Sequence, residues 1–182
     1  AAETWGRQLA VFIVFAMLAH YLGPAALGLA ALAMSAPNFL TITLQQGIPD
    51  ALVQREEIDP VHFSSAFWLI VLTGAVFSLI IFLAAAPIAK AFGEPELEPL
   101  ICWTSVIVVI RSADIVPHAW LKRNMEYRLF AVRALASTFV AGIVGIGMAM
   151  AGYGVWSMSG FQLAGSITGS AFLLIGCGWL PR

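Results

Sequence analysis

Charge is the scarcest property of this sequence. Its 182 residues include 9 Lys or Arg and 10 Asp or Glu, so that 10% are charged and 60% are hydrophobic. A typical soluble domain carries about 25% charged residues, and a soluble fold of this size would lack the polar surface to cover so much apolar side chain. The formal net charge of −1 gives no bulk attraction to nucleic acid. The composition therefore predicts an integral membrane protein that binds no nucleic acid.

Cysteine and the motifs of known catalytic or metal sites are also scarce. The two cysteines, Cys102 and Cys177, lie in apolar runs far from charge, which is typical of buried thiols rather than of a disulfide or a metal site. His62 and His118 have no partner at the spacing of metal ligands, and no phosphate-binding loop or nucleophile elbow is present. We therefore expect no catalytic residue, no metal and no cofactor, and a protein that is not an enzyme.

Three long intervals contain no charged residue, namely 8–49, 60–89 and 134–181. A transmembrane helix needs about 20 apolar residues, so the first and third intervals can each hold two helices if the chain turns midway. Gly23-Pro24 can make the first turn, and the glycines of "AGYGVWS" can make the other.

A further apolar segment precedes Pro117. The sequence thus predicts an all-α membrane protein in which residues 1–182 form a single bundle of six transmembrane helices. Their expected spans are about 5–22, 26–47, 63–86, 99–117, 130–150 and 155–177.

Basic residues are unevenly divided between the two sides that this topology creates. The loops on one side hold only Lys90, whereas the side with both termini holds Arg7, Arg55, Lys122, Arg123, Arg128, Arg133 and Arg182. Short loops rich in Lys and Arg stay in the cytoplasm. We therefore expect a multi-pass protein of the inner (plasma) membrane with both termini in the cytoplasm.

Five stretches together resemble one family of membrane transporters. In chain order they are "LAHYLGPAALGLAALAM", "GIPDALVQREEIDPVHFSSAFWL", "APIAKAFGEPELEPLI", "VPHAWLKRNMEYRLFAVR" and "AGYGVWSMSGFQ". Their order and spacing, over nearly the whole chain, are similar to those of the polysaccharide and O-antigen flippases, the Wzx-like branch of the MOP exporter superfamily, which serves exopolysaccharide and lipopolysaccharide biosynthesis.

This resemblance implies a fold, a cargo and a missing partner. The family has two six-helix bundles, so the chain would be the N-terminal lobe, and we expect a fragment whose C-terminal half is absent. The implied activity is the flipping of polyprenyl-pyrophosphate-linked oligosaccharide, with the lipid tail kept among membrane lipids. The two bundles would rock around a central, partly cationic cavity in alternating access.

Only a few polar residues within the spans are candidates for contact with cargo, because an ionisable group at a helix centre costs about 2.5–3.5 kcal/mol on insertion scales. Arg7 lies about one turn into the first span and either snorkels to the headgroups or meets cargo. Gln45 and Gln46 close the second span, where amides either satisfy helix ends or line a sugar path. With Arg111, these residues are the substrate-binding candidates.

Arg111 and Asp114 are opposite charges within the apolar run "VIVVIRSADIVPHAW". If the span ends at Pro117, Arg111 lies about 9 Å and Asp114 about 4–5 Å from the cytoplasmic end. Their i, i+3 spacing lets them pair, and an Asp in a last helical turn needs a cationic partner. The pair either clamps the helix end or acts as a cytoplasmic gate or coupling pair. Arg133 is interpreted as an anchor at the cytoplasmic interface.

Three other functions stay open. A drug or cation-coupled exporter of the same superfamily would have a carboxylate deep in the first two spans, and none lies between Glu3 and Asp50. A membrane enzyme such as a sugar-polymer ligase would have long external loops with catalytic side chains, whereas the loops here are short. A structural membrane subunit without transport activity is not excluded by the composition alone.

Overall fold

The computed structural model describes residues 2–45, 60–123 and 127–176, and at some ends of these ranges it describes the backbone alone. This part of the chain forms α1 (Ala2–Leu44), α3 (Pro60–Phe92), α4 (Leu97–Arg123), α5 (Tyr127–Met150) and α6 (Trp156–Gly176), and it contains no strand. Each of these 5 helices includes a stretch long and apolar enough to cross a membrane. The chain is therefore an all-α membrane protein, as the sequence predicts.

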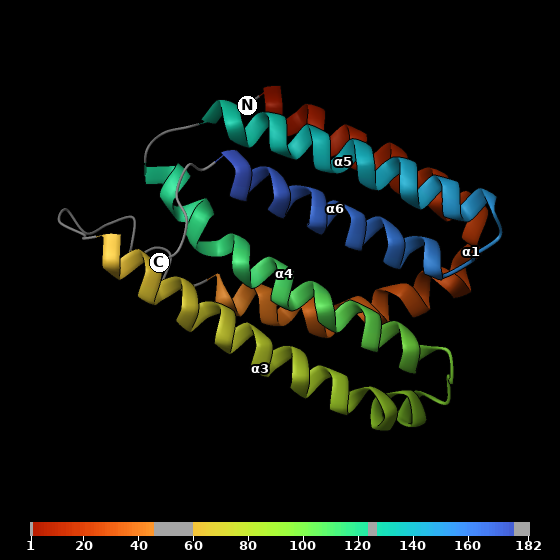
Figure 1. Ribbon diagram of the computed structural model, residues 1–182. Helices are drawn as coiled ribbons and strands as arrows, with labels where there is room; N and C mark the ends of the chain where they lie inside the picture. The colour runs from red at the N-terminus through yellow and green to blue at the C-terminus, as the bar shows by residue number, and fades with distance from the viewer. Residues whose placement is uncertain (1, 46–59, 124–126, 177–182) are drawn as a thin grey trace.

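The first two expected spans are joined into one helix, which is why the described helices number 5 and not six. Gly23, inside α1, has φ 73° and ψ 170°, a conformation that suits glycine because it lacks a Cβ. Pro24 follows, with its φ already suited to a first helical turn. Figure 1 shows that α1 (red to orange) bends sharply, so that its first part lies along α5 and its second part returns beside α4. The predicted turn is confirmed, and it divides α1 into two helical parts that meet at Gly23.

Two helices continue beyond the expected spans 63–86 and 99–117, and each passes a proline. α3 runs past Pro87 to Phe92, and α4 runs past Pro117 to Arg123. Membrane-spanning helices tolerate proline because neighbouring helices can satisfy the freed backbone groups, and more than half of the apolar stretch of α4 is buried in the protein. At 1.5 Å per residue, Arg111 is about 21 Å from Leu97 and about 18 Å from Arg123. Arg111 therefore lies near the middle of α4, and its depth in the membrane stays a prediction.

Glycines close the hairpin turns at one end of the bundle. Gly93 has φ 70°, its N–H donates to the Lys90 carbonyl at 3.2 Å, and the N–H of Glu94 donates to the Ala89 carbonyl at 3.1 Å. This double closure is a Schellman motif, which satisfies the last carbonyls of α3. Gly152, with φ 83°, closes α5 with the same pattern of bonds. The bend at Gly23 lies at this end of the bundle too (Figure 1).

Small residues let the paired helices approach each other closely. A Cβ at Gly74 in α3 would collide with the side chain of Ser112 in α4. A Cβ at Gly145 in α5 would come within 2.8 Å of the Phe161 side chain in α6. Such close contact replaces the hydrophobic driving force that helices lack within lipid. α4 also packs against α1 and α6, whereas α4 and α5 have little direct contact over the described residues.

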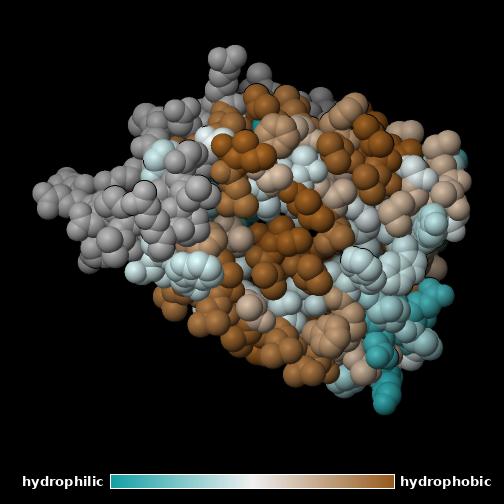
Figure 2. Space-filling model, viewed as in Figure 1, coloured by the Kyte–Doolittle hydropathy of each residue, from teal (hydrophilic) through white to brown (hydrophobic). Residues whose placement is uncertain are grey.

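Large apolar side chains cover the outside of the bundle, as a bilayer requires. Figure 2 shows apolar residues over much of the visible face, and hydrophilic residues gathered where α3 turns into α4. Among the apolar side chains, the exposed fractions reach 65–70% at Phe12, Phe39, Leu72, Leu83, Phe139 and Met150. In water this surface would drive aggregation, but in hydrocarbon it is the stable arrangement.

Candidate functional site

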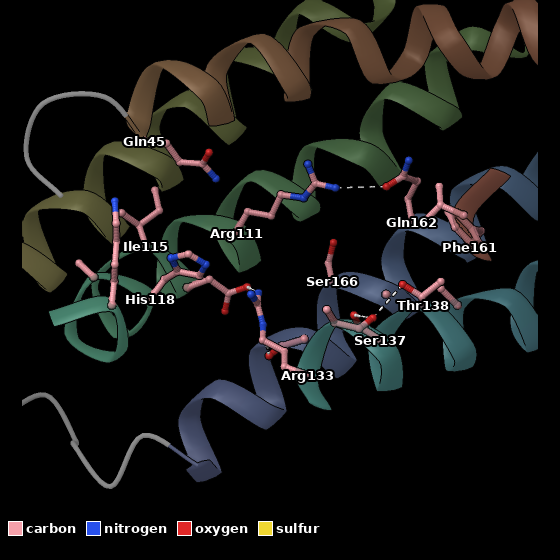
Figure 3. A pocket seen from close by; sticks show the side chains of 18 residues that line it. Gln45, Arg111, Ile115, His118, Arg133, Ser137, Thr138, Phe161, Gln162 and Ser166 are labelled. Carbon is pink, nitrogen blue, oxygen red and sulfur yellow. Dashed lines mark hydrogen bonds and ion pairs between the residues drawn. The ribbon is translucent and has the colours of Figure 1, made fainter. Parts of the chain in front are cut away.

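A cavity of about 730 Å³ lies between α1, α4, α5 and α6. α4 and α5 are both packed against α6, and along the described chain their backbones approach each other little. Their side chains meet at the Arg133–Asp114 ion pair and at the rings of His118 and Phe130, whose centroids lie 4.5 Å apart. Figure 3 shows polar side chains from several helices directed into this space. The polar side chains that line the cavity therefore face the inside of the bundle, whereas much of the outer surface is apolar.

The lining of the cavity is basic and rich in hydrogen-bonding groups. Arg111, Lys122 and Arg133 contribute three cations, and Asp114 is the single carboxylate among the described lining residues. The uncharged polar side chains of the lining are the amides and hydroxyls of Gln45, Ser137, Thr138, Gln162 and Ser166, together with the imidazole of His118. An anion with several hydroxyl groups suits such a surface, because cations compensate its charge while amides and hydroxyls exchange hydrogen bonds with it.

Arg133 in α5 reaches across the cavity to α4. Its Nη2 lies 3.1 Å from Oδ2 of Asp114, and its Nε donates to the backbone carbonyl of Gly169 in α6, also at 3.1 Å. A Cβ at position 169 would lie 3.3 Å from Nη2, so glycine leaves the room that the guanidinium occupies. The interpretation of Arg133 as an interfacial anchor is wrong, because its side chain turns inward and joins α4, α5 and α6.

The Asp114 carboxylate is almost fully enclosed. The Ser170 hydroxyl lies beside it. Within the described part of the chain, however, neither Oδ1 of Asp114 nor Oγ of Ser170 has a hydrogen bond of good geometry. A buried carboxylate is costly unless a cation and hydrogen bonds compensate it, so the stability of this region depends on Arg133.

Arg111 has different partners from those that the sequence predicts. Its Nη1 donates to Oδ1 of Asn38 in α1, and its Nη2 donates to Oε1 of Gln162 in α6, each at 3.2 Å. The ion pair of Asp114 is with Arg133, not with Arg111. The i, i+3 spacing permits an ion pair on an isolated helix, but tertiary packing here offers both side chains nearer partners. Arg111 and Asp114 still line one cavity, and their role as a gate or coupling pair stays a prediction.

Of the residues proposed from sequence, the structure brings Gln45, Arg111 and Asp114 together around one cavity. The backbone of Arg7 belongs to α1, but its side chain lies outside the described part, and Gln46 lies outside the described residues altogether. In the described ranges, no group of three or more His, Cys, Asp or Glu side chains could hold a metal ion.

Sequence reasoning missed Arg133 as a cavity residue and Asn38 as a partner of Arg111, and it named Gln162 as a polar residue within a span without giving it a specific role. One signal was available in the charge-free third interval, where Gln162, Ser166 and Ser170 recur every four residues along one face of α6. A polar stripe at helical spacing within an apolar span indicates a face that is turned away from lipid. No comparable pattern surrounds Asn38.

Comparison with known proteins gives two relatives and a family. A family model described as "Polysaccharide biosynthesis protein" matches residues 17–182. The chain is 30% identical over 149 residues to the succinoglycan biosynthesis transport protein ExoT of Rhizobium meliloti (strain 1021), which covers 81% of this chain and 30% of that protein. It is 29% identical over 86 residues to the lipopolysaccharide biosynthesis protein WzxC of Escherichia coli (strain K12), covering 44% of this chain and 16% of that protein. The chain thus spans less than a third of either relative. No solved structure matches it significantly.

The ion pair of Arg133 and Asp114 yields a prediction about stability. Asp114→Asn leaves the guanidinium without a counter-ion in a largely buried site, and we expect it to lower the free energy of unfolding by on the order of 3 kcal/mol. Arg133→Gln in the same chain removes the unpaired charge, so the double variant should regain much of this loss. Thermal unfolding of the full-length protein in detergent measures both effects. If the losses in free energy of unfolding of the single variants Asp114→Asn and Arg133→Gln simply add in the double variant, the two side chains are not coupled.

Proposed function

The chain belongs to the polysaccharide biosynthesis protein family, and on that premise we propose that it forms one lobe of a transporter that flips polyprenyl-pyrophosphate-linked oligosaccharides across the membrane. These units would serve exopolysaccharide or O-antigen biosynthesis. The observation that carries this proposal is the basic, hydrogen-bonding cavity of about 730 Å³ inside a bundle whose outer surface is apolar. A lipid-linked oligosaccharide has matching parts, namely an anionic pyrophosphate, a hydroxylated sugar and an apolar tail.

The polar lining suits the head of such a cargo. A pyrophosphate diester carries negative charge that guanidinium and ammonium groups bind well in a site of low dielectric. The sugar presents hydroxyls, for which Ser137, Thr138 and Ser166 offer neutral hydrogen-bonding partners. The apolar outer surface lets the tail stay in the bilayer while the head crosses.

A second lobe would supply the opposite wall of the transport path. The match to this chain covers 30% of ExoT, which is named a transport protein, so ExoT has room for more than one such bundle. With α1 counted as two segments on either side of Gly23, the bundle has the six membrane crossings expected of the N-terminal lobe of a flippase. Rocking of two such lobes would expose the cavity to each side of the membrane in turn.

The charge distribution of the helix ends supports an orientation with the N-terminal end of α1 in the cytoplasm. Lys122, in the last turn of α4, lies at that end of the bundle, and Gln45 directly follows α1 there (Figures 1 and 3). The opposite end carries Glu94, Glu96 and Glu98 in and beside the turn between α3 and α4. Because Lys122 and Gln45 line the cavity, it extends toward the cytoplasmic end, where lipid-linked units are to be loaded.

This orientation can be tested with single cysteines in the full-length protein. Cys102 and Cys177 are first replaced by serine, and then Glu94→Cys or Arg123→Cys is introduced. In intact cells a membrane-impermeant maleimide should label position 94 and not position 123, and opening of the inner membrane should expose position 123. Labelling of position 123 but not of position 94 in intact cells would reverse the orientation.

Transport through the cavity can be tested by filling it. Ser137 and Phe139 both lie on α5, but Ser137 lines the cavity whereas Phe139 is 70% exposed on the outer surface. In cells that rely on the full-length protein, Ser137→Trp should reduce surface polysaccharide at least tenfold, because the indole occupies the path of the sugar. Phe139→Trp, the matched control, should leave it near the normal level. Normal polysaccharide with Ser137→Trp, at equal amounts of protein in the membrane, would contradict a path through this cavity.

A further inference from the structure

The two arginines of the cavity have partners of different charge. Arg133 faces the Asp114 carboxylate, so the pair is neutral as a whole. Arg111 faces the side-chain oxygens of Asn38 and Gln162, which are neutral amides. The local charge around Arg111 therefore remains positive. Figure 3 shows the Arg111 guanidinium directed toward Gln162, with Arg133 in another part of the cavity.

We infer that Asn38 and Gln162 form an amide clamp that positions Arg111 and leaves its charge free to bind a phosphate-type anion, whereas Arg133 is a structural cation. The amide clamp is defined by these two residues alone. The identification of the anion with the pyrophosphate of the cargo rests on the proposed function. The clamp makes Asn38 and Gln162 positioning residues, since they act through Arg111.

The geometry of the clamp fixes the guanidinium from two sides. Arg111 stands on α4, Asn38 belongs to the returning part of α1, and Gln162 belongs to α6, so three helices hold one side chain. A guanidinium has five N–H donors, and the clamp occupies two of them. The others remain available for a planar, two-point contact with phosphate oxygens. Asn38 directly follows Pro37, which is fully buried in the bundle.

The choice of neutral partners argues for ligand binding over a purely structural role. Arg111 lies near the middle of a membrane-spanning helix. An uncompensated charge there has a high free-energy cost, so an ionisable residue at such a position is a candidate for function. A carboxylate would compensate it fully, as Asp114 does for Arg133 only one turn further along α4. Amide oxygens hold the guanidinium in place without cancelling its charge. The positive charge can then be compensated by an incoming anion and selects cargo of that kind.

The test uses Gln162→Glu. This substitution keeps the shape of the side chain and strengthens its hydrogen bond with Arg111, but its carboxylate cancels the positive charge of Arg111. The full-length protein in phosphatidylcholine nanodiscs is titrated with inorganic pyrophosphate, and its melting temperature is measured in parallel. We expect Gln162→Glu to weaken pyrophosphate binding at least about tenfold while the melting temperature is kept or raised. Gln8→Glu is the matched control, since Gln8 is exposed on α1 and is absent from the described lining of the cavity, and it should change binding less than about twofold.

Further variants separate positioning from charge. Asn38→Asp places the compensating charge on another helix and should reproduce the loss, which protects the test against a folding defect specific to position 162. Gln162→Ala should weaken binding less than Gln162→Glu, because Asn38 still holds Arg111, and the double Asn38→Ala, Gln162→Ala variant should weaken it more than either alone. Unchanged pyrophosphate affinity in both acidic variants would overturn the inference, as would a wild-type protein that binds no pyrophosphate.

Two arms identify the source of the anion. If replacement of phosphatidylcholine by phosphatidylglycerol in the nanodiscs competes away the pyrophosphate, the anion is a lipid headgroup, and the assignment to cargo is overturned. If the competition is absent, pyrophosphate is the better ligand and the assignment is supported. Binding is measured without transport, so a failure of the proposed function would appear in transport measurements, such as normal polysaccharide with Ser137→Trp, and would leave the clamp intact.

Discussion

The cavity depends on an ion pair that joins two helices whose backbones make little contact in the described part of the chain. α4 and α5 both pack on α6, and Arg133 joins them by reaching from α5 to Asp114 in α4 while its Nε rests on the Gly169 carbonyl. In a medium of low dielectric neither charge is tolerated alone, so the two side chains hold each other in place. The ion pair joins α4 and α5 beside the ring contact of His118 with Phe130, and the backbones of the two helices stay apart. A polar space inside a membrane bundle is the result.

The rest of the bundle follows from the need to hide polar groups from lipid. α1 turns at Gly23 and brings its second part back beside α4, which places Asn38 next to Arg111. The glycines at 74 and 145 let the α3–α4 and α5–α6 pairs close tightly, so the looser region is confined to the cavity. Apolar side chains then form the outer surface. A basic interior with an apolar exterior is the arrangement that a carrier of anionic, lipid-linked sugars requires, and this agreement links the fold to the proposed function.

Much of the fold could be predicted from the composition and the charge-free intervals. The bilayer requires every membrane-spanning helix to be apolar, so each span leaves the same kind of signal in the sequence. The turn at Gly23-Pro24, the hairpin turns and the family were visible in the sequence. The helix end at Pro117 was placed wrongly because a local rule for proline ignores the helices that surround it. Asp114 was given the wrong ion-pair partner for a similar reason, since spacing along one helix cannot show that Arg133 approaches from another. Asn38 carries no local signal at all, and only the returning part of α1 brings it to Arg111.

The central claim is that the full-length protein moves lipid-linked oligosaccharide from the inner to the outer leaflet, and the leaflet itself can be measured. Cells depleted of the full-length protein are converted to spheroplasts, and their polyprenyl-linked units are probed with a membrane-impermeant lectin before and after the membrane is opened. If the protein is the translocator, the units accumulate and bind lectin only after opening. Units that reach the outer face at the normal level in depleted cells would contradict the claim.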